Sequence, residues 1–249
     1  MLRDHPTGNY RFLPGITAFS SGVIAAPGHE IVHATLGAVL PWREGFALIE
    51  RHLRGQGRPR TALCAIELRS PAPFTFQGFA GFNEGYRALL GEWGILVGDD
   101  NPIARTNVAP VFAPPREPSL YAFSYTAAGA TPAPTFVVAG AGEMRDRAQG
   151  ADGIVRHGDT SPDAMREKAR FVMNVMQERM RALGADWSRA STIDVYTAQP
   201  IFGFLEDILK PAGAAAIHGL RWFPSRPPIQ GLEFEVDLRG VGRELTLSS

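Results

Sequence analysis

Residues 218–240, HGLRWFPSRPPIQGLEFEVDLRG, decide how the rest of the chain is interpreted. An arginine, Arg221, stands beside two aromatic residues, and a turn-rich link with three prolines leads from it to an alternating run at 232–237. Alternation with a period of two predicts a strand with an apolar and an acidic face. The apolar face carries Leu232, Phe234 and Val236, and the acidic face carries Glu233, Glu235 and Asp237. Two interpretations stay open here: a carboxylate-binding arginine answered by an acid on the next strand, or a surface hairpin with ordinary charges.

The composition predicts a globular protein of the cytoplasm. The 249 residues suffice for one large domain or two small ones, and 25 basic against 25 acidic residues give no net charge. That balance disfavours nucleic-acid and anionic-membrane partners. The N-terminal residues lack the apolar core of a signal peptide, and no run reaches the roughly 20 apolar residues of a membrane span. The single Cys64 stands in an apolar run, which favours a buried, inert thiol.

The first half of the chain predicts alternating strands and helices. Residues 19–24 form a short strand, with 33–39 as the return strand of a hairpin. Pro41 starts a helix over 42–53, where apolar residues recur at three- and four-residue steps. A buried strand over 61–68 follows, then a helix over 79–93, and then a polar turn at 101–108 that leads into a strand. Residues 120–125 form the last strand of this half.

The second half predicts a similar order after the link AAGATPAP, residues 127–134. Its elements are a strand at 136–140, a long helix that Ser161 caps, a strand at 191–196, a shorter helix at 201–209 and two final strands. Repetition with a period near half the chain argues for an internal duplication. We therefore expect an α+β fold of two tandem domains, 9–128 and 135–246, with a linker at 129–134. Each has a mixed β-sheet with two helices on one face.

Other motifs do not point to a cofactor or a metal. The run VVAGAG at 137–142 lacks the third glycine and the helix of a dinucleotide-binding turn. The six histidines show no metal-ligand spacing, and no nucleophile-elbow motif is present. We therefore expect no cofactor and no metal site.

The element order and three short motifs resemble the RidA/YjgF family. The motifs are Ser21-Gly22 on the first hairpin, Phe82-Asn83 in the second helix and Ala104-Arg105-Thr106-x-Val108. The resemblance covers residues 9–128 well and 135–246 more loosely. Members of this family deaminate reactive enamines and imines, and their α+β subunits form trimers with sites in the clefts between subunits. The resemblance therefore implies two tandem RidA-like domains and a homo-oligomer, either a trimer or a dimer of two-domain chains.

The resemblance also implies site residues. The arginine that grips the substrate carboxylate falls on Arg105 in the first half and Arg221 in the second, and its planar fork matches a carboxylate bidentately. The glutamate that activates water falls on Glu233, while the first half has no acid at 119–122. Arg221, Glu233 and Arg105 are thus the catalytic candidates, with the working cleft in the second half. The substrate-binding candidates are Asn83, Trp222, Ser21 and Gly22; for Trp222, a core or subunit-contact role stays open.

These residues imply hydrolysis of the C–N bond of a small carboxylate-bearing enamine or imine, of the 2-aminoacrylate or aminomuconate type, with release of ammonia. Arginine would fix the carboxylate, and glutamate would orient a water. The main alternative is a catalytically silent binding or scaffold protein, because neither half keeps every motif. A lyase acting on an enol-pyruvyl acid is a further possibility. A ribonuclease is disfavoured by the zero net charge.

Overall fold

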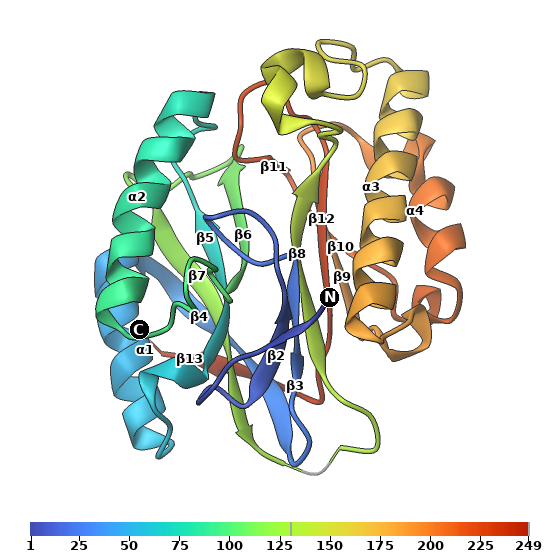
Figure 1. Cartoon of the computed structure of the whole chain (residues 1–249). Coiled ribbons are helices and arrows are strands. Elements are labelled where there is room, and N and C mark those ends of the chain that lie inside the picture. Colours follow the sequence, from blue (N-terminus) through green and yellow to red (C-terminus); the bar gives the residue numbers. More distant parts are fainter. Residues whose placement is uncertain (130, 249) are drawn as a thin grey trace.

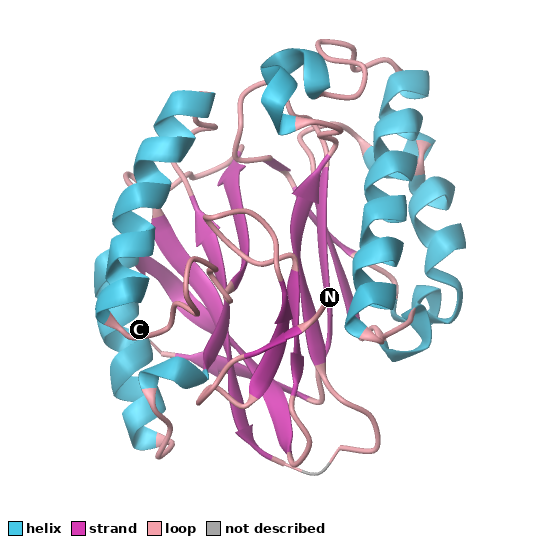
Figure 2. Cartoon of the chain, viewed as in Figure 1, coloured by secondary structure: helices cyan, strands magenta, loops and turns pink. Residues whose placement is uncertain are grey.

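Two β-sheets face each other, and helices cover both outer faces, so the chain has four layers (Figure 1). The computed structural model describes residues 1–129 and 131–248. Figure 2 shows the long helices on the two flanks and the strands in between. Apolar residues form one core between each sheet and its helices, and a third core between the two sheets. No helix of the described residues is long and apolar enough to cross a membrane.

The first sheet has seven strands in the order β1-β2-β3-β8-β12-β9-β10. They are β1 (Arg3–Asp4), β2 (Tyr10–Leu13), β3 (Gly22–Ala25), β8 (Phe136–Gly142), β12 (Glu235–Gly240), β9 (Thr192–Tyr196) and β10 (Arg221–Phe223). The second sheet has six strands in the order β11-β6-β5-β7-β4-β13. They are β11 (Ser225–Arg226), β6 (Ala104–Pro110), β5 (Leu63–Arg69), β7 (Ser119–Ala128), β4 (His29–Pro41) and β13 (Arg243–Leu247).

Four α-helices supply the outer layers. They are α1 (Trp42–Gly55), α2 (Phe76–Glu92), α3 (Pro162–Leu183) and α4 (Leu205–Ala212). The 3₁₀ turns are η1 (Arg60–Ala62), η2 (Arg147–Gly153), η3 (Trp187–Arg189), η4 (Ile201–Gly203) and η5 (Gly213–His218). α1 begins directly after Pro41 and buries Phe46, Ile49 and Leu53, as the spacing predicted. α3 begins at the predicted Ser161 cap and ends at Gly184, whose φ of 75° favours glycine.

The two sheets contain the same four-strand unit. β4, β5, β6 and β7 lie in the order β4-β7-β5-β6, and β8, β9, β10 and β12 lie in the order β8-β12-β9-β10. In both units the first two pairs are antiparallel and the last pair is parallel. Each unit also places its helices after its first and second strands. The prediction of a mixed α+β fold with helices on one face of each sheet is confirmed.

Strands from each half complete the sheet of the other half. β1, β2 and β3 belong to the sheet of β8, whereas β11 and β13 belong to the sheet of β4. The predicted hairpin between 19–24 and 33–39 is therefore wrong. Both edges of β3 are occupied, by β2 and by β8, and β4 pairs with β7 and β13 instead. The predicted division at 129–134 remains a prediction, and its two sides share both sheets.

The final alternating strand begins later than predicted, at Glu235. The reason is Glu143, which directly follows β8. Its carboxylate accepts hydrogen bonds from the backbone N–H groups of Glu233 (2.7 Å) and Phe234 (3.0 Å), so these groups do not join the ladder. Lys168 of α3 lies 3.1 Å from the same carboxylate, and both side chains are fully buried. This buried ion pair sets where β12 starts.

Candidate active site

A cavity of about 90 Å³ lies between the two sheets and has room for several water molecules. Both halves of the chain contribute to its wall, and its charged members are Arg105, Arg147, Arg179 and Glu235. The other lining residues are Phe19, Phe79, Asn107, Gly140, Ala141, Gly142, Met144, Val175, Pro228, Ile229 and Leu232. Apolar walls with a few convergent polar groups are typical of small-molecule sites.

Arg105 of β6 is 2% exposed, and its side chain has one hydrogen-bond partner among the described residues. Its Nη2 donates to Oδ1 of Asn83 at 2.8 Å, and its guanidinium lies over the rings of Tyr86 (4.8 Å) and Phe19 (4.9 Å). Its Nη1 is buried and has no hydrogen-bond partner within residues 1–129 and 131–248. Burial lowers the pKa of Arg105 to about 10, so it remains a cation at neutral pH. An unpaired buried donor is costly, and an anion in the cavity would relieve that cost.

Asn107 offers a second free donor two residues further along β6. Its Oδ1 accepts from the Ser70 hydroxyl at 2.8 Å, which leaves its amide nitrogen to donate. That nitrogen is buried and unpartnered among the described residues. Because residues two apart on a strand point to the same side, Arg105 and Asn107 both line the cavity. Together they form a pair of preorganised donors.

Glu235, the first residue of β12, supplies the acid of the cavity. The residue is 4% exposed, and its carboxyl forms no hydrogen bond with any residue that the structure describes. It lies so close to Gly140 of β8 that a Cβ at that position would collide with Oε1. Burial raises the pKa of Glu235 to about 8, against the opposing effect of the three arginines. Glu235 is therefore largely protonated at pH 7, and a general acid–base residue works best with such a pKa.

Arg179 and Arg147 complete the charged wall. Arg179 projects from α3, and its Nη1 donates to the carbonyl of Ala139 at 2.9 Å. Burial, together with the nearby charge of Arg147, lowers the pKa of Arg179 to about 10. Arg147 belongs to η2 and reaches solvent, yet partial burial still lowers its pKa. The cavity thus holds three guanidinium groups and one largely neutral carboxyl, which suits it to bind an anion.

The predicted pair Arg221 and Glu233 is not brought together in this cavity. Arg221 of β10 forms a bidentate ion pair with Asp194, at 2.6 Å for each contact, and its side chain is 43% exposed. Glu233 accepts a hydrogen bond from the side chain of Gln199 at 3.2 Å. Neither residue lines the cavity. A catalytic role for them remains a prediction, which this geometry does not favour.

The predicted substrate-binding residues occupy different places. Asn83 holds Arg105 and lines an outer cavity next to the first. Trp222 packs against the core beneath α3 and α4 and donates its indole N–H to the carbonyl of Thr197 at 3.0 Å. The backbone carbonyl of Ser21 accepts a hydrogen bond from the N–H of Ala139 on β8, and Gly22 packs closely against Val137 and Leu183. Of the contacts just described, the one between the Asn83 side chain and Arg105 reaches a residue of the cavity wall.

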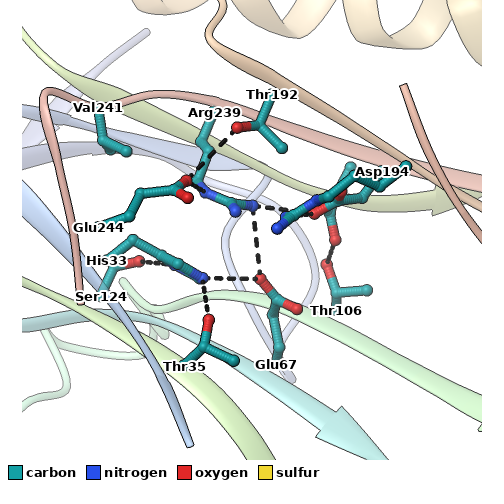
Figure 3. Close-up of polar contacts among 12 residues, drawn as sticks. His33, Thr35, Glu67, Thr106, Ser124, Thr192, Asp194, Arg239, Val241 and Glu244 are labelled. Atoms are coloured by element: carbon teal, nitrogen blue, oxygen red, sulfur yellow. Dashed lines mark hydrogen bonds and ion pairs between the residues drawn. The ribbon is translucent and has the colours of Figure 1, made fainter. Parts of the chain in front are cut away.

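A buried network of charges joins the two sheets beside the cavity (Figure 3). Arg239 of β12 is its centre: it contacts Asp194 (2.9 Å), Glu244 (2.8 Å) and Glu67 (3.8 Å). His33 of β4 lies 3.7 Å from Glu67 and 3.1 Å from the Ser124 hydroxyl. Burial, together with the charge of Arg239, lowers the pKa of His33 to about 3, so His33 is neutral at pH 7.

Three acids of this network come close enough to suggest a metal site. Oxygens of Glu67, Asp194 and Asp237 lie within 4.8 Å of one another. However, Arg239 is paired with Asp194, and burial raises the pKa of Asp237 well above its usual range. Asp237 also accepts hydrogen bonds from Thr106 (2.6 Å) and the hydroxyl of Tyr196 (2.9 Å). Glu67 in turn accepts from Arg69 at 3.4 Å, so the three acids belong to an internal network and we assign them a structural role.

Sequence reasoning missed Glu235, Arg179, Arg147 and Asn107. The alternation at 232–237 had placed Glu235 on the acidic face beside Glu233, but spacing alone does not choose between two acids on one face. Asn107 stands within the quoted motif at its unspecified position. Arg179 and Arg147 reach the cavity from a helix and a turn far away in the sequence, and no local pattern indicates this.

Comparison with known proteins identifies the family. The family model described as "2-aminomuconate deaminase CnbZ" matches residues 2–245. A 2-amino-5-chloromuconate deaminase of Comamonas testosteroni is 43% identical over 243 residues, which cover 96% of each chain. A chorismatase crystal structure matches 89% of this chain and 77% of its own, with a TM-score of 0.50 and 13% identity, which shows a related fold.

The expected RidA/YjgF membership is supported only in part. The yjgF gene product of E. coli matches 46% of this chain and 86% of its own, with a TM-score of 0.30 and 13% identity. Such structures cover less than half of the chain, whereas the aminomuconate family model and the Comamonas relative cover nearly all of it. The chain belongs to the family described as 2-aminomuconate deaminase CnbZ.

Proposed function

We propose that the chain hydrolyses the C–N bond of an aminomuconate-type enamine in the cavity between its sheets. One observation carries the proposal: Glu235, a buried acid with a pKa of about 8 and no hydrogen bond of its own, lines the same cavity as the unpaired Nη1 of Arg105. An acid and a carboxylate-binding donor on opposite walls suit a substrate whose amino carbon bears a carboxylate. Family membership and the activity in the name of the Comamonas relative support this substrate type.

The free donors of β6 would position the substrate. Nη1 of Arg105 and the amide of Asn107 would bind the carboxylate next to the amino carbon, since both are buried and unpartnered. Asn83 holds the other side of the guanidinium and keeps it in place. Such charge-assisted bonds in a buried site are stronger than in water.

Glu235 would start the reaction as an acid. An anionic substrate neutralises the arginines that oppose the raised pKa of Glu235, so binding raises this pKa further and keeps the carboxyl protonated. Glu235 then donates its proton to a carbon of the enamine, which becomes an iminium. The C=C electron pair forms the new C–H bond, and the nitrogen lone pair forms the C=N bond.

Hydrolysis then requires one water molecule. The Glu235 carboxylate takes a proton from water as the oxygen attacks the iminium carbon, which gives a carbinolamine. The acid returns this proton to nitrogen, and the C–N bond breaks with its electron pair leaving on ammonia. The hydroxyl proton passes to Glu235 as the carbonyl forms. The net reaction is enamine plus water to ketone plus ammonia, and Glu235 ends protonated as it began.

The matching strand orders β4-β7-β5-β6 and β8-β12-β9-β10 support the proposed internal duplication. In this alignment β6 and β10 are equivalent, so Arg105 and Arg221 occupy equivalent strands. The proposed site combines Arg105 of the first unit with Glu235 of the second. The site would thus lie between two units of one chain, as RidA sites lie between subunits. Assembly of the chain into a homo-oligomer and its location in the cytoplasm remain predictions.

The test compares Glu235→Gln and Arg105→Met with Glu233→Gln and Arg221→Met, using ammonia release from 2-aminomuconate. We expect the first two variants to lose at least about 100-fold in kcat/KM, the lower range for general acid–base catalysis, while the other two keep activity within about threefold. Circular dichroism checks that each variant is folded. Loss of activity in Glu233→Gln alone would move the site to the cleft expected from the sequence. An inactive wild type would favour the silent binding protein.

A further inference from the structure

The cavity holds more positive charge than one carboxylate needs. Arg105, Arg147 and Arg179 line it, and the single acid among its lining residues, Glu235, is largely protonated at pH 7. A substrate with one carboxylate, paired with Arg105, leaves two guanidinium groups without an anion. Arg105 is buried and Arg179 is half-buried, and guanidinium groups without partners in such places are unfavourable, so the wall as a whole fits a ligand with two negative charges.

Backbone carbonyls of β8 fix the position of the Arg179 guanidinium. Nη1 donates to the carbonyls of Ala139 (2.9 Å) and Gly140 (3.4 Å) on β8, which anchors one end of the fork. The other two guanidinium nitrogens have no acceptor within the described part of the chain. Arg179 comes from α3, outside the first sheet, whereas Arg105 comes from the second sheet. Glu235 lines the same cavity as both arginines, and the charge of each lowers its pKa against the effect of burial.

Arg147 stands where this cavity meets an outer one. It lines the inner cavity and also an open hollow of about 320 Å³ that includes Asn83. Phe79 and Ile229 line both cavities too, so these three residues form the shared wall. No hydrogen bond or ion pair of the Arg147 side chain is formed within residues 1–129 and 131–248, and Glu235 is the acid whose charge acts on it. The solvent-reaching Arg147 is thus a free cation at the entrance.

We propose that Arg179 and Arg147 bind the second carboxylate of the substrate and make the site selective for dicarboxylates. This inference rests on the proposed function for the position of the reacting carbon beside Glu235, between Arg105 and Arg179. Arg179 supplies the fixed contact, and Arg147 closes over the same carboxylate from the entrance. Small imino acids with one carboxylate leave this end of the site empty and are poor substrates.

Binding of unreactive ligands tests the inference without requiring turnover. Muconate (hexa-2,4-dienedioate) and sorbate (hexa-2,4-dienoate) share one carbon chain and differ in the second carboxylate. Isothermal titration calorimetry would compare wild type, Arg179→Met and Arg147→Met with Arg181→Met. Arg181 lies on the same helix two residues away and is exposed, so it is a matched control.

We expect wild type and Arg181→Met to bind muconate about 10- to 100-fold more tightly than sorbate, which corresponds to one or two charge-assisted bonds. Arg179→Met and Arg147→Met should each reduce the ratio of muconate affinity to sorbate affinity at least about fivefold. Their affinity for sorbate should stay within about threefold of the wild-type value. Equal affinity of wild type for the two ligands would overturn the inference, even if aminomuconate is deaminated. If Arg179→Met does not fold, Arg147→Met and the wild-type ratio still decide the question.

Turnover separates this inference from the proposed function. Ammonia release from 2-aminomuconate and from 2-iminobutyrate, a monocarboxylate, would be measured with the same proteins. A selective muconate site without turnover of either compound would refute the deaminase and keep the dicarboxylate site. Turnover of both compounds with equal kcat/KM in the wild type would refute the inference and keep the deaminase.

Discussion

Among the residues that line the cavity, Glu235 combines full burial of its carboxyl with a pKa of about 8. An unfolded glutamate titrates near 4.3, so the folded chain binds one more proton than the unfolded chain between these two values. The raised pKa therefore adds stability that is present below about pH 4 and is lost as the pH rises through about 8. The acid that would carry the chemistry thus weakens the fold in alkaline solution.

Glu235→Gln should remove this alkaline loss. Between pH 5 and pH 9, the free energy of unfolding should fall by on the order of 4 kcal/mol more in the wild type than in the variant. The pKa of Glu235 is about 8 in the folded chain and near 4.3 in the unfolded chain, and glutamine does not titrate. Urea unfolding at five pH values measures the difference. Parallel curves for the two proteins would show that Glu235 ionises normally. In the wild type, kcat/KM should also fall above about pH 8, because the reaction starts from the acid form.

The alternating run at 232–237 shows what a strand pattern predicts and what it does not. Val236 packs with the helices, while Glu235 and Asp237 face the other sheet, as alternation implied. The acidic face is buried, however, and not in solvent. Alternation distinguishes two faces, but it does not reveal whether a second sheet covers the polar one. Glu233 and Glu235 share one face in the sequence pattern, but in the fold Glu233 precedes β12 and contacts Gln199, whereas Glu235 lines the cavity.

The start of β12 depends on three elements that meet at Glu143. This carboxylate binds the two N–H groups that precede β12, and Lys168 of α3 neutralises it. Lys168 also donates to the carbonyl of Val155 at 2.7 Å. Glu235 directly follows the second of these N–H groups, that of Phe234, so the ion pair also sets the position of the proposed acid. No sequence pattern indicates a contact between residues 143 and 168.

Lys168→Met should therefore be strongly destabilising. It leaves the Glu143 carboxylate buried without its cation, and we expect a loss of about 3–5 kcal/mol in the free energy of unfolding. The double variant Glu143→Gln/Lys168→Met should recover at least about half of that loss, because no charge is then buried. A double-mutant cycle by urea denaturation measures both the loss in free energy of unfolding and its recovery in the double variant. A loss under about 1 kcal/mol in Lys168→Met would contradict the role of the pair.

The two sheets meet through polar groups as well as apolar ones, and this distinguishes the whole fold from two independent layers. Arg239 joins strands of both sheets, and neutral His33 lies within the same network. Burial of His33, together with the charges of Arg239 and Arg221, lowers its pKa more than the acids Glu244 and Asp194 raise it. Length, composition and helix spacing predicted the α+β class. They did not predict this interface, because it pairs residues 33, 67, 194 and 239.

Acid should loosen the contact between the sheets. The pKa of His33 is lowered to about 3, so the unfolded chain binds more protons below pH 6.5, and stability is lost as the pH falls from there toward 3. Between pH 7 and pH 3.5, the free energy of unfolding of His33→Gln should fall by on the order of 4 kcal/mol less than that of the wild type. His218 is exposed, so His218→Gln should match the wild type. Thermal unfolding monitored by circular dichroism over this range is the measurement. Identical acid sensitivity of all three proteins would exclude His33 as the cause.

The place of β13 has a consequence for how the protein is made. β13 pairs with β4 in parallel, joining Arg243 to Val32 and Leu247 to Leu36. During synthesis, β4 and its neighbours leave the ribosome long before their last partner exists. At 5–20 residues per second, the outer edge of β4 waits on the order of ten seconds or more with unpaired backbone groups. A nascent chain of this kind is exposed to aggregation throughout that interval, so its yield should depend on the speed of translation and on chaperones that shield the open edge.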